Sequence, residues 1–297
     1  MEKEKTGKPS AFRRFKQWQL PKMVHIFPLA FVMVFFIAIP LCYILVISFF
    51  EKGTYGGVVY HFTLSNYIEI FQPMYMKVFA ESMVMAAETT IVCILVGYPF
   101  AYFVCKKKAL TKGLCMMFVI VPFFTSSVVR TYGWMVLLRT EGVINNILMK
   151  TGLIKEPLEM LYTQGCVVLG MAYTFLPFMI MPLVSSIGKL DRSLLEAASD
   201  LGARPVKSFL KVTLPLTAPG IFAGTIMVFI PALGYFYIPE MLGGSKVMII
   251  GNLIKNQFYT ARNWPLGAAL SVFLIILTLI FVTAYKKTGG SVDELGM

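Results

Sequence analysis

Four long stretches of this 297-residue chain contain no charged side chain, and they restrict what the chain can fold into. They cover residues 26–50, 160–188, 212–239 and 263–285, and are 25, 29, 28 and 23 residues long. A helix needs about 20 consecutive apolar residues to cross the hydrocarbon core of a bilayer. Each stretch is therefore long enough to form a transmembrane helix.

Two shorter stretches, residues 89–105 and 113–129, hold 17 uncharged residues each. They also reach spanning length if they extend past Glu88 and Arg130. The composition agrees, because 57% of the chain is hydrophobic and 14% is charged, against about 25% charged residues in an average soluble domain. We therefore predict an all-α integral membrane protein with six transmembrane helices.

The lysines and arginines predict the orientation of these helices. An even number of spans places both termini on one side, together with residues 106–113 and 188–218. That side carries 18 of the 27 lysines and arginines, and the opposite side carries 9. Because basic residues accumulate in cytoplasmic loops, both termini are predicted to be cytoplasmic. The same bias, with anionic lipid headgroups as partners, accounts for the net charge of +12 without nucleic-acid binding.

Three regions follow from these assignments. Residues 1–25 form a basic, amphipathic cytoplasmic segment whose apolar residues include Trp18, a composition suited to the membrane surface. Residues 26–285 form the transmembrane domain, and residues 286–297 form a cytoplasmic tail.

The outer loops are expected to be partly ordered. Residues 53–67 are rich in turn-forming residues, and short helices are expected over residues 143–149 and 249–259. The second of these helices is expected to be amphipathic.

Residues 188–218 form a cytoplasmic loop of 31 residues, which is too long for a plain connector between two spans. Asp191 is placed to cap a helix over residues 192–201. Gly202 is placed to end that helix, because glycine accepts the left-handed conformation of a helix terminus.

A second short helix is expected in the same loop, over residues 206–212. Pro205 suits its first turn, where a missing N–H has no cost. Pro215 and Pro219 are expected to end it and to start the fifth span. That span contains Pro231, Gly234 and Pro239, so it is expected to be kinked or broken near mid-membrane.

No motif for nucleotide binding or catalysis is present in the sequence. The chain lacks a phosphate-binding glycine loop, a zinc-binding histidine pair and a nucleophile elbow. Its two histidines, His25 and His61, flank the first span and cannot ligate one ion together. We therefore predict a non-catalytic protein with no metal or cofactor of its own. The energy for any work it does must come from elsewhere.

The long cytoplasmic loop carries a specific pattern. It resembles the EAA signature of type I ABC importer permeases, although the family usually has Ile where this chain has Val. The residues that match or lie within the signature are Glu196, Ala197, Ala198, Asp200, Gly202, Val212, Leu214 and Pro215. The resemblance implies that this loop docks on an ATPase subunit. Small alanines let a helix sit deep in a groove, and Glu196 offers a charge to a basic residue there.

Other short segments narrow the resemblance to the permeases of spermidine/putrescine ABC transporters. They include Gly97-Tyr98-Pro99-Phe100-Ala101, Leu176-Pro177-Phe178-Met179, Phe236-Tyr237 and Ile250-Gly251-Asn252. The resemblance implies a multi-pass protein of the bacterial inner membrane that pairs with a second, homologous permease. It also implies two ATPase subunits that bind ATP and Mg²⁺, and an extracytoplasmic polyamine-binding protein.

A polyamine is an extended polycation, so its path should offer carboxylates and aromatic faces. Glu240 lies at the outer end of the fifth span, and Tyr237 and Phe236 precede it by three and four residues, on one helical face. This spacing indicates a cation site. The alternative is a glutamate at the water interface beside Pro239 that needs no partner, and both interpretations stay open.

Glu88 and Trp134 are further candidates for the path. A carboxylate within a span is costly, so Glu88 should face the protein interior. Pairing with Arg130, or with a group on the second permease, is favoured over a substrate contact. Trp134, like Tyr132 and Trp264, is more typical of an anchor at the membrane interface than of a path aromatic.

Two other functions remain open from the residues alone. One is the same type of importer with another cargo, such as an oxyanion, iron or thiamine, which would require basic groups or helix N-termini along the path. The other is an ion-coupled secondary carrier, in which Glu88 would bind the coupling ion. The signature in the cytoplasmic loop argues against the carrier.

Overall fold

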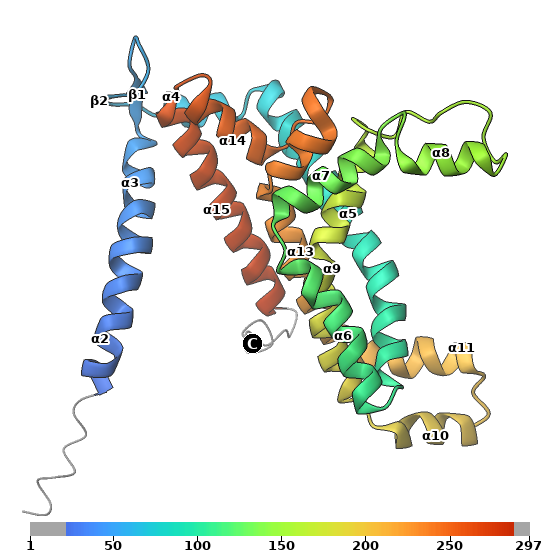
Figure 1. Ribbon diagram of the computed structural model, residues 1–297. Coiled ribbons are helices and arrows are strands. Elements are labelled where there is room, and N and C mark those ends of the chain that lie inside the picture. Colours follow the sequence, from blue (N-terminus) through green and yellow to red (C-terminus); the bar gives the residue numbers. More distant parts are fainter. Residues whose placement is uncertain (1–21, 288–297) are drawn as a thin grey trace, which may run out of the picture.

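The computed structural model describes residues 22–287, and helices make up most of that length (Figure 1). The predicted N-terminal segment lies outside the described residues except for its last four, and so does most of the predicted tail. Four helical segments are long and apolar enough to cross a membrane, namely Ala30–Ile47, Pro73–Cys105, Gln164–Gly188 and Trp264–Ala284. They belong to α2, η2 and α3 (Lys22–Met33, Val34–Ala38, Ile39–Ile47), α5 (Pro73–Cys105), α9 (Gln164–Gly188) and α15 (Trp264–Lys287).

Two further helix pairs reach spanning length only when each pair is taken together, and both pairs are sharply bent. Helix α6 (Ala109–Phe123) meets the segment Ser127–Lys150, which contains α7 (Ser127–Leu138) and α8 (Val143–Lys150), at 92°. The segment Pro205–Leu216 meets α13 (Ala218–Gly234) at 63°. By length and composition, the described residues therefore hold four candidate membrane spans, or six if each bent pair is counted as one span.

Helices α5, α9 and α13 pack together as the core of the bundle. Small residues on α13 permit this close approach to α9. A Cβ atom on Gly224 would lie 2.6 Å from Sδ of Met179, and one on Gly220 would lie 2.9 Å from the carbonyl oxygen of Pro182. Between α5 and α9, the thiol of Cys93 donates to the carbonyl of Ala172 at 3.5 Å.

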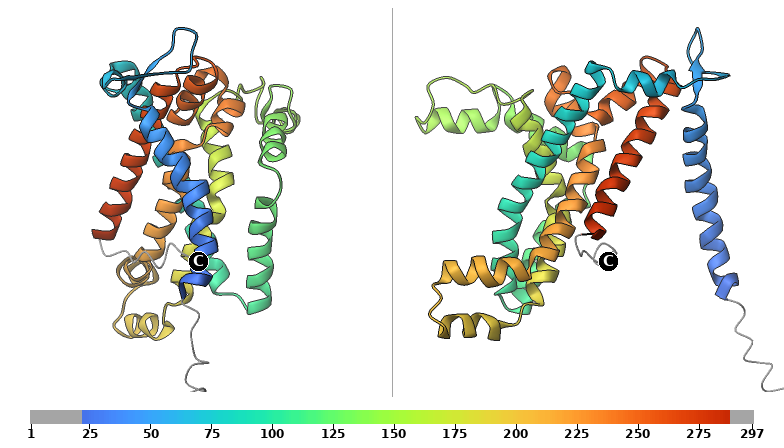
Figure 2. Two further views of the ribbon diagram at one scale, coloured as in Figure 1. Left: turned by 90° about the vertical axis from the view of Figure 1, so that its left-hand side faces the viewer. Right: turned by 180° about the vertical axis from the view of Figure 1, so that it is seen from behind.

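The first helical segment stands apart from this bundle (Figures 1 and 2). Only 6% of the residues in Ala30–Ile47 are buried, and large apolar side chains such as Phe36, which is 65% exposed, cover it on all sides. Its last part, α3, contacts α15. A soluble protein does not expose so long an apolar helix, so its surroundings are lipid or another protein.

The outer loop predicted only as turn-rich contains a small antiparallel hairpin, formed by β1 (Phe50–Lys52) and β2 (Val58–Phe62). The side-chain amide of Asn66, in α4 (Ser65–Ile70), donates to the carbonyls of Ser48 and Phe50 at 3.0 and 2.8 Å and fixes the base of the hairpin. These strands are too short to show an alternating pattern, which is why the sequence does not predict them.

Helix α14 (Ile250–Tyr259) lies at the same end of the molecule as the hairpin. Its first residue is tied to α5, because the backbone N–H of Ile250 donates to the hydroxyl of Ser82 at 2.8 Å. Apolar residues of α4, α5, α14 and α15 form a second buried cluster there. The predicted helices over residues 143–149 and 249–259 are thus confirmed as α8 and α14.

The predicted break in the fifth span lies at Gly234. Helix α13 continues through Pro231 and ends at Gly234, and Tyr235 is extended. Ala232 and Leu233 are buried in the core and hold the last turn in place. The short segments η4 (Pro239–Gly243) and η5 (Gly244–Lys246) follow before α14.

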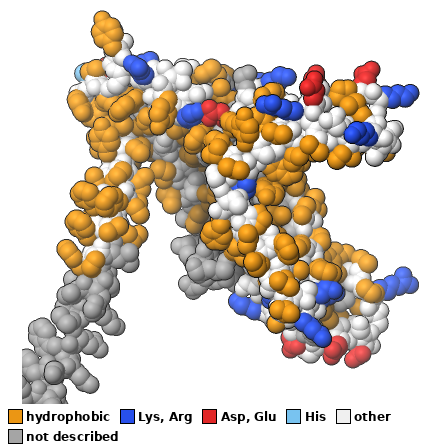
Figure 3. All heavy atoms as spheres, viewed as in Figure 1, with side chains coloured by type: hydrophobic (Ala, Val, Ile, Leu, Met, Phe, Trp, Pro, Cys, Tyr) orange, Lys and Arg blue, Asp and Glu red, His pale blue; other side chains and the backbone are white. Residues whose placement is uncertain are grey.

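The distribution of side chains matches a membrane protein. On the face in Figure 3, hydrophobic side chains cover the middle, and most charged side chains gather at the two ends. Helices α10 (Arg192–Asp200) and α11 (Pro205–Ser208) lie at one end, where α2 also begins, and α8 and α14 lie at the other (Figures 1 and 2).

Candidate functional site

The loop over residues 188–218, here called the signature loop, folds into the two short helices that the sequence predicts. The first is α10, and the carboxylate of Asp191 caps it by accepting the backbone N–H of Ser193 at 3.0 Å. This hydrogen bond lowers the pKa of Asp191 below its ordinary value, because it stabilises the ionised carboxylate.

Gly202 ends α10 in the way that the sequence predicts. Its φ angle is +75°, in the left-handed region. Its N–H donates to the carbonyl of Ser199 at 2.8 Å, and the N–H of Ala203 donates to the carbonyl of Ala198 at 3.0 Å. These two bonds form a Schellman motif, which satisfies the last carbonyls of α10 and turns the chain toward the second helix.

The second helix is longer than predicted. It begins at Pro205, as expected, but continues through Pro215 to Leu216. The π-helical turn η3 (Phe209–Thr213), in which the N–H of Leu214 donates to the carbonyl of Phe209, ends two residues before Pro215. A π-helical turn widens the helix where the regular hydrogen-bond ladder is interrupted, so Pro215 does not end it. The helix ends at Leu216, and Thr217 separates α12 (Leu214–Leu216) from α13.

The signature residues divide into an exposed set and an anchoring set. On α10, Glu196, Ala197 and Asp200 are exposed, and Ala198 is half-buried. On the second helix, Val212 and Leu214 are half-buried and Pro215 is exposed. The face that a partner protein can reach therefore lies on α10, next to several exposed apolar side chains of the same loop, namely Leu194, Leu201, Val206 and Leu210.

An aromatic contact that the sequence does not predict joins the signature loop to α5. The ring of Phe209 lies 5.6 Å from that of Tyr98 and 6.1 Å from that of Tyr102, in edge-to-face geometry with both. The hydroxyl of Tyr98 also lies 2.8 Å from that of Thr217, at the bend before α13. Tyr98 belongs to the segment Gly97-Tyr98-Pro99-Phe100-Ala101, which carries part of the family resemblance. That resemblance is the one feature of the sequence that could have drawn attention to Tyr98.

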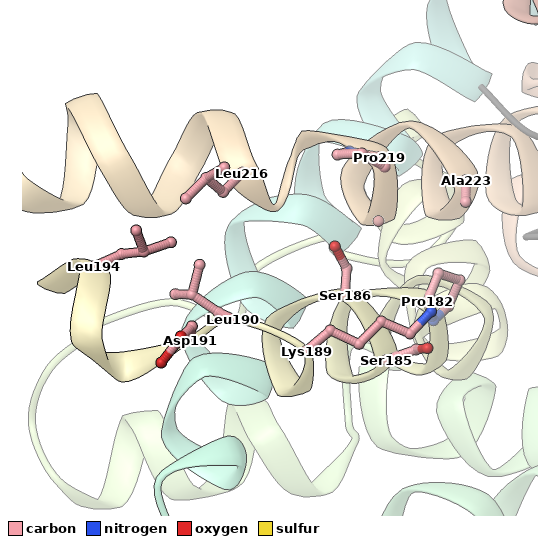
Figure 4. Close-up of a pocket in the computed structure, with 11 residues that line it drawn as sticks. Pro182, Ser185, Ser186, Lys189, Leu190, Asp191, Leu194, Leu216, Pro219 and Ala223 are labelled. Carbon is pink, nitrogen blue, oxygen red and sulfur yellow. The ribbon is translucent and has the colours of Figure 1, made fainter. Parts of the chain in front are cut away.

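A cavity of about 410 Å³ lies between α10 and the bend at Thr217 (Figure 4). Leu194 of α10 and Leu216 of α12 face it from two sides, and Ser186 and Lys189 line it near the end of α9. Helix α10 packs on α11 and η3, whereas the cavity separates it from the start of α13. This arrangement leaves room for α10 to move with the second helix.

The predicted cation site holds a cation of the chain itself. Nζ of Lys255 donates to Oε1 of Glu240 at 2.5 Å and lies 5.6 Å from the ring centroid of Phe236. Phe236 and Glu240 are one helical turn apart, because the N–H of Glu240 donates to the carbonyl of Phe236 at 3.1 Å. Glu240 therefore has a partner within this chain, and both interpretations of its role stay predictions.

Asn252 completes this cluster. Its side-chain amide donates to the carbonyl of Phe236 at 3.0 Å. The residue is only 8% exposed, and its Oδ1 atom is buried without a hydrogen-bond partner among the described residues. Tyr237 is half-buried and has no hydrogen bond or aromatic contact to the cluster in this part of the chain.

Glu88 is not paired with Arg130. Its Oε2 accepts a hydrogen bond from the side chain of Gln164 at 2.8 Å. Gln164 is the first residue of α9, so the carboxylate also lies near a helix N-terminus, which favours negative charge. Arg130 instead donates to the carbonyl of Pro122 at 3.2 Å and lies over Phe123. The arginine thus satisfies the broken end of α6.

Trp134 is half-buried and packs edge-to-face on Tyr173 of α9, with ring centroids 5.6 Å apart. This contact joins α7 to the core. Tyr132 and Trp264 are exposed, as interfacial anchors are.

Comparison with known proteins defines the class to which this architecture belongs. Residues 27–287 match the family of binding-protein-dependent transport system inner membrane components. The match covers most of the chain, and the chain therefore belongs to this family. Permease subunits of this kind form a transport path and do not hydrolyse ATP, so the chain is a transport component and not an enzyme.

Comparison with individual proteins gives a narrower similarity than the family match. The chain is 42% identical over 255 residues to the spermidine/putrescine transport system permease protein PotB of Haemophilus influenzae, covering 86% of this chain and 89% of that protein. The PotB protein of Escherichia coli gives the same identity, with 93% of that protein covered.

Solved structures support the fold. A permease chain of a bacterial ABC transporter that imports the acidic polysaccharide alginate superposes with a TM-score of 0.71, over 93% of this chain and 98% of that one. Its sequence identity is 16%, so the likeness concerns the architecture and not the cargo.

Proposed function

We propose that this chain is one of two permease subunits of an ATP-driven polyamine importer in the bacterial inner membrane. The 42% identity to the two spermidine/putrescine permeases, over 86% of this chain, carries the proposal. The cation-binding character of the cluster around Glu240 supports it, because an oxyanion path would be lined by basic groups instead.

The proposed topology has six spans with both termini in the cytoplasm. Counting each bent pair as one span gives six. The signature loop and the start of α2 lie at one end of the molecule (Figure 2). In the topology predicted from the sequence, the side of this loop carries 18 of the 27 lysines and arginines, which supports a cytoplasmic position.

The proposed complex has a second, homologous permease, two ATPase subunits and an extracytoplasmic polyamine-binding protein. The exposed face of α10, with Glu196 and Ala197, is the proposed dock for an ATPase. The binding protein would contact the outer segments over residues 130–165 and 243–264, which contain α8 and α14. ATP and Mg²⁺ would be bound by the ATPase subunits alone.

The contacts of the signature loop suggest how closure of the ATPases reaches the membrane. A displacement of α10 carries the second helix with it, because the two helices pack together. Phe209 passes the displacement to Tyr98 on α5, and the bend at Thr217 passes it to α13. Since α5, α9 and α13 form one packed core, they would rotate as a rigid body against the second permease.

Uptake by a reconstituted complex tests the cargo and the energy source together. The chain is purified with its partner subunits, placed in liposomes with ATP inside, and given the binding protein loaded with radiolabelled spermidine. We expect uptake that requires ATP and persists with an uncoupler. Uptake driven by an ion gradient without ATP would instead indicate a secondary carrier. ATP-driven uptake of an oxyanion, iron or thiamine but not of spermidine would exclude the polyamine cargo.

The dock is tested by co-purification from native membranes. Glu196→Lys reverses the exposed charge on α10, and Gly202→Pro cannot adopt the positive φ angle of that position. Wild type should recover an ATPase and a second permease, and both variants should lose the ATPase. Glu141→Lys, an exposed charge reversal in the loop before α8, is the control that should retain the ATPase. Full recovery of the ATPase with both signature variants would contradict the dock.

A further inference from the structure

The cluster around Glu240 has the composition of a site for an alkylammonium group. Glu240 supplies the charge, Phe236 supplies an aromatic face, and Lys255 occupies the position between them. The buried Oδ1 atom of Asn252 is an acceptor that no donor satisfies in the described part of the chain. A buried acceptor without a partner is unusual in a folded protein, and Asn252 adjoins the site because its side-chain amide donates to the carbonyl of Phe236.

The side chain of Lys255, which fills the site, resembles the proposed polyamine cargo chemically. Beyond its Cα atom, a lysine side chain consists of four methylene groups and a primary ammonium. The same aminobutyl group forms one end of a linear diamine such as putrescine, and one arm of spermidine. We propose that Lys255 is a tethered occupant of a substrate site, and that a terminal ammonium of the polyamine enters this site by displacing it. This inference rests on the proposed function.

Such an exchange suits a transport path. Both Lys255 and Glu240 remain partly open to solvent, with side-chain exposures of 31% and 43%, and ion pairs of this kind are weak. An incoming ammonium replaces one charge-assisted hydrogen bond with an equivalent one, so the carboxylate is never left without a cation. A path must also release what it binds, and the return of Lys255 to Glu240 would expel the substrate.

A second lysine–glutamate pair at the same end of the molecule shows what an ordinary surface pair looks like. Lys77 and Glu81 lie one helical turn apart on α5, with 3.8 Å between their charged atoms and exposures of 77% and 53%. Among the described residues, the ammonium of Lys77 contacts no aromatic ring. This pair therefore provides a matched control.

Equilibrium binding of radiolabelled putrescine to the purified complex, without binding protein, tests the inference. Lys255→Met removes the competing ammonium and keeps an unbranched side chain, so it should bind putrescine about two- to fivefold more tightly than wild type. Lys255→Arg should bind it more weakly than wild type, because a guanidinium holds a carboxylate through two hydrogen bonds. Glu240→Gln should abolish the binding, and Lys77→Met should leave it unchanged.

The opposite signs expected for the two Lys255 variants separate competition from a structural role, in which both would weaken binding. Equal putrescine affinities for wild type, Lys255→Met and Lys255→Arg would overturn the inference. So would weaker binding by both, or failure of Lys255→Met to co-purify with its partner subunits while Lys77→Met does. Spermidine uptake by the wild-type complex is measured in parallel. If uptake is present and the affinities do not change, the inference fails and the proposed function stands.

Discussion

The hydroxyl of Tyr98, near the C-terminal end of the core helix α5, lies 2.8 Å from the hydroxyl of Thr217, at the bend where the signature loop becomes α13. Thr217 itself donates to the carbonyl of Thr213 at 2.8 Å, so Tyr98 is left to donate to Thr217. This bond and the aromatic contact of Phe209 fix the second helix of the loop against α5.

Tyr98→Phe should weaken the link between ATP hydrolysis and transport. The substitution keeps the ring contact with Phe209 and removes one hydrogen bond, at a cost of ~1 kcal/mol in stability. We expect the number of polyamine molecules imported per ATP to fall about 2- to 30-fold, which corresponds to a coupling loss of ~0.5–2 kcal/mol. Transport and hydrolysis are measured together on liposomes.

Tyr235→Phe is the matched control for this prediction. It removes a similar bond, 2.9 Å long, between Tyr235 and Ser127, which does not involve the signature loop. It should lower stability by a similar amount and leave the transport ratio unchanged. Equal ratios for both variants would show that the Tyr98–Thr217 bond carries no coupling.

Gly202→Ala should loosen the turn between α10 and the second helix. The position has a φ angle of +75° and open space around it, so the cost comes from the backbone alone, ~1–2 kcal/mol. Gly202→Asn should cost less, because asparagine tolerates this conformation. Gly113→Ala, where the space is open and φ is not positive, should be neutral. Recovery of the ATPase on co-purification should fall in the order Gly113→Ala, Gly202→Asn, Gly202→Ala, and any other order would contradict the reason given.

Loss of the cap at Asp191 should destabilise α10 selectively. Asp191→Ala removes the acceptor for the N–H of Ser193, whereas Asp191→Asn keeps an acceptor oxygen. Amide hydrogen exchange over α10 should therefore accelerate in the alanine variant and change little in the asparagine variant. Unchanged exchange in the alanine variant would show that the cap does not hold α10.

The same cap predicts a pH dependence. Because folding lowers the pKa of Asp191, its contribution is fully present above the ordinary carboxyl pKa and is lost as the pH falls through the lowered value. Protection of α10 from exchange should decline over that acidic range in wild type. It should show no such step in Asp191→Asn.

Gly220→Val should force α9 and α13 apart. A Cβ atom at Gly220 would lie 2.9 Å from the carbonyl oxygen of Pro182, which is backbone and cannot rotate away. Overpacking of this kind costs ~1–3 kcal/mol. Gly234→Ala, in the same helix, meets only an ordinary contact of 3.6 Å with Leu274. Thermal unfolding in detergent should shift to lower temperature for Gly220→Val and hardly at all for Gly234→Ala. Equal midpoints would mean that the helices can separate without cost.

Features with a local cause could be predicted from the sequence. The uncharged stretch 160–188, predicted to form a transmembrane helix, contains α9, Gln164–Gly188, because a long apolar run has few other structures available to it. Asp191 and Gly202 bound α10 as expected, since a cap and a left-handed turn depend on residues only a few positions away.

Features that depend on distant neighbours could not be predicted. Lys255 lies 15 residues from Glu240 in sequence, and no periodicity links the two. The partner of Glu88 proved to be Gln164, 76 residues away. Pro215 looked like a helix end, yet the π-helical turn that precedes it has no sequence signature. In each case several local structures were possible, and tertiary packing determined which one formed.

The isolation of the first helical segment has a consequence for the life of the protein in the cell. With 6% of its residues buried, this segment packs little against the rest of its own chain beyond the contact of α3 with α15. Its retention would then rest on lipid and on a neighbouring subunit. We expect a copy made without that neighbour to be an orphan that membrane proteases recognise and remove, so the scarcer subunit would set how many complete complexes a cell accumulates.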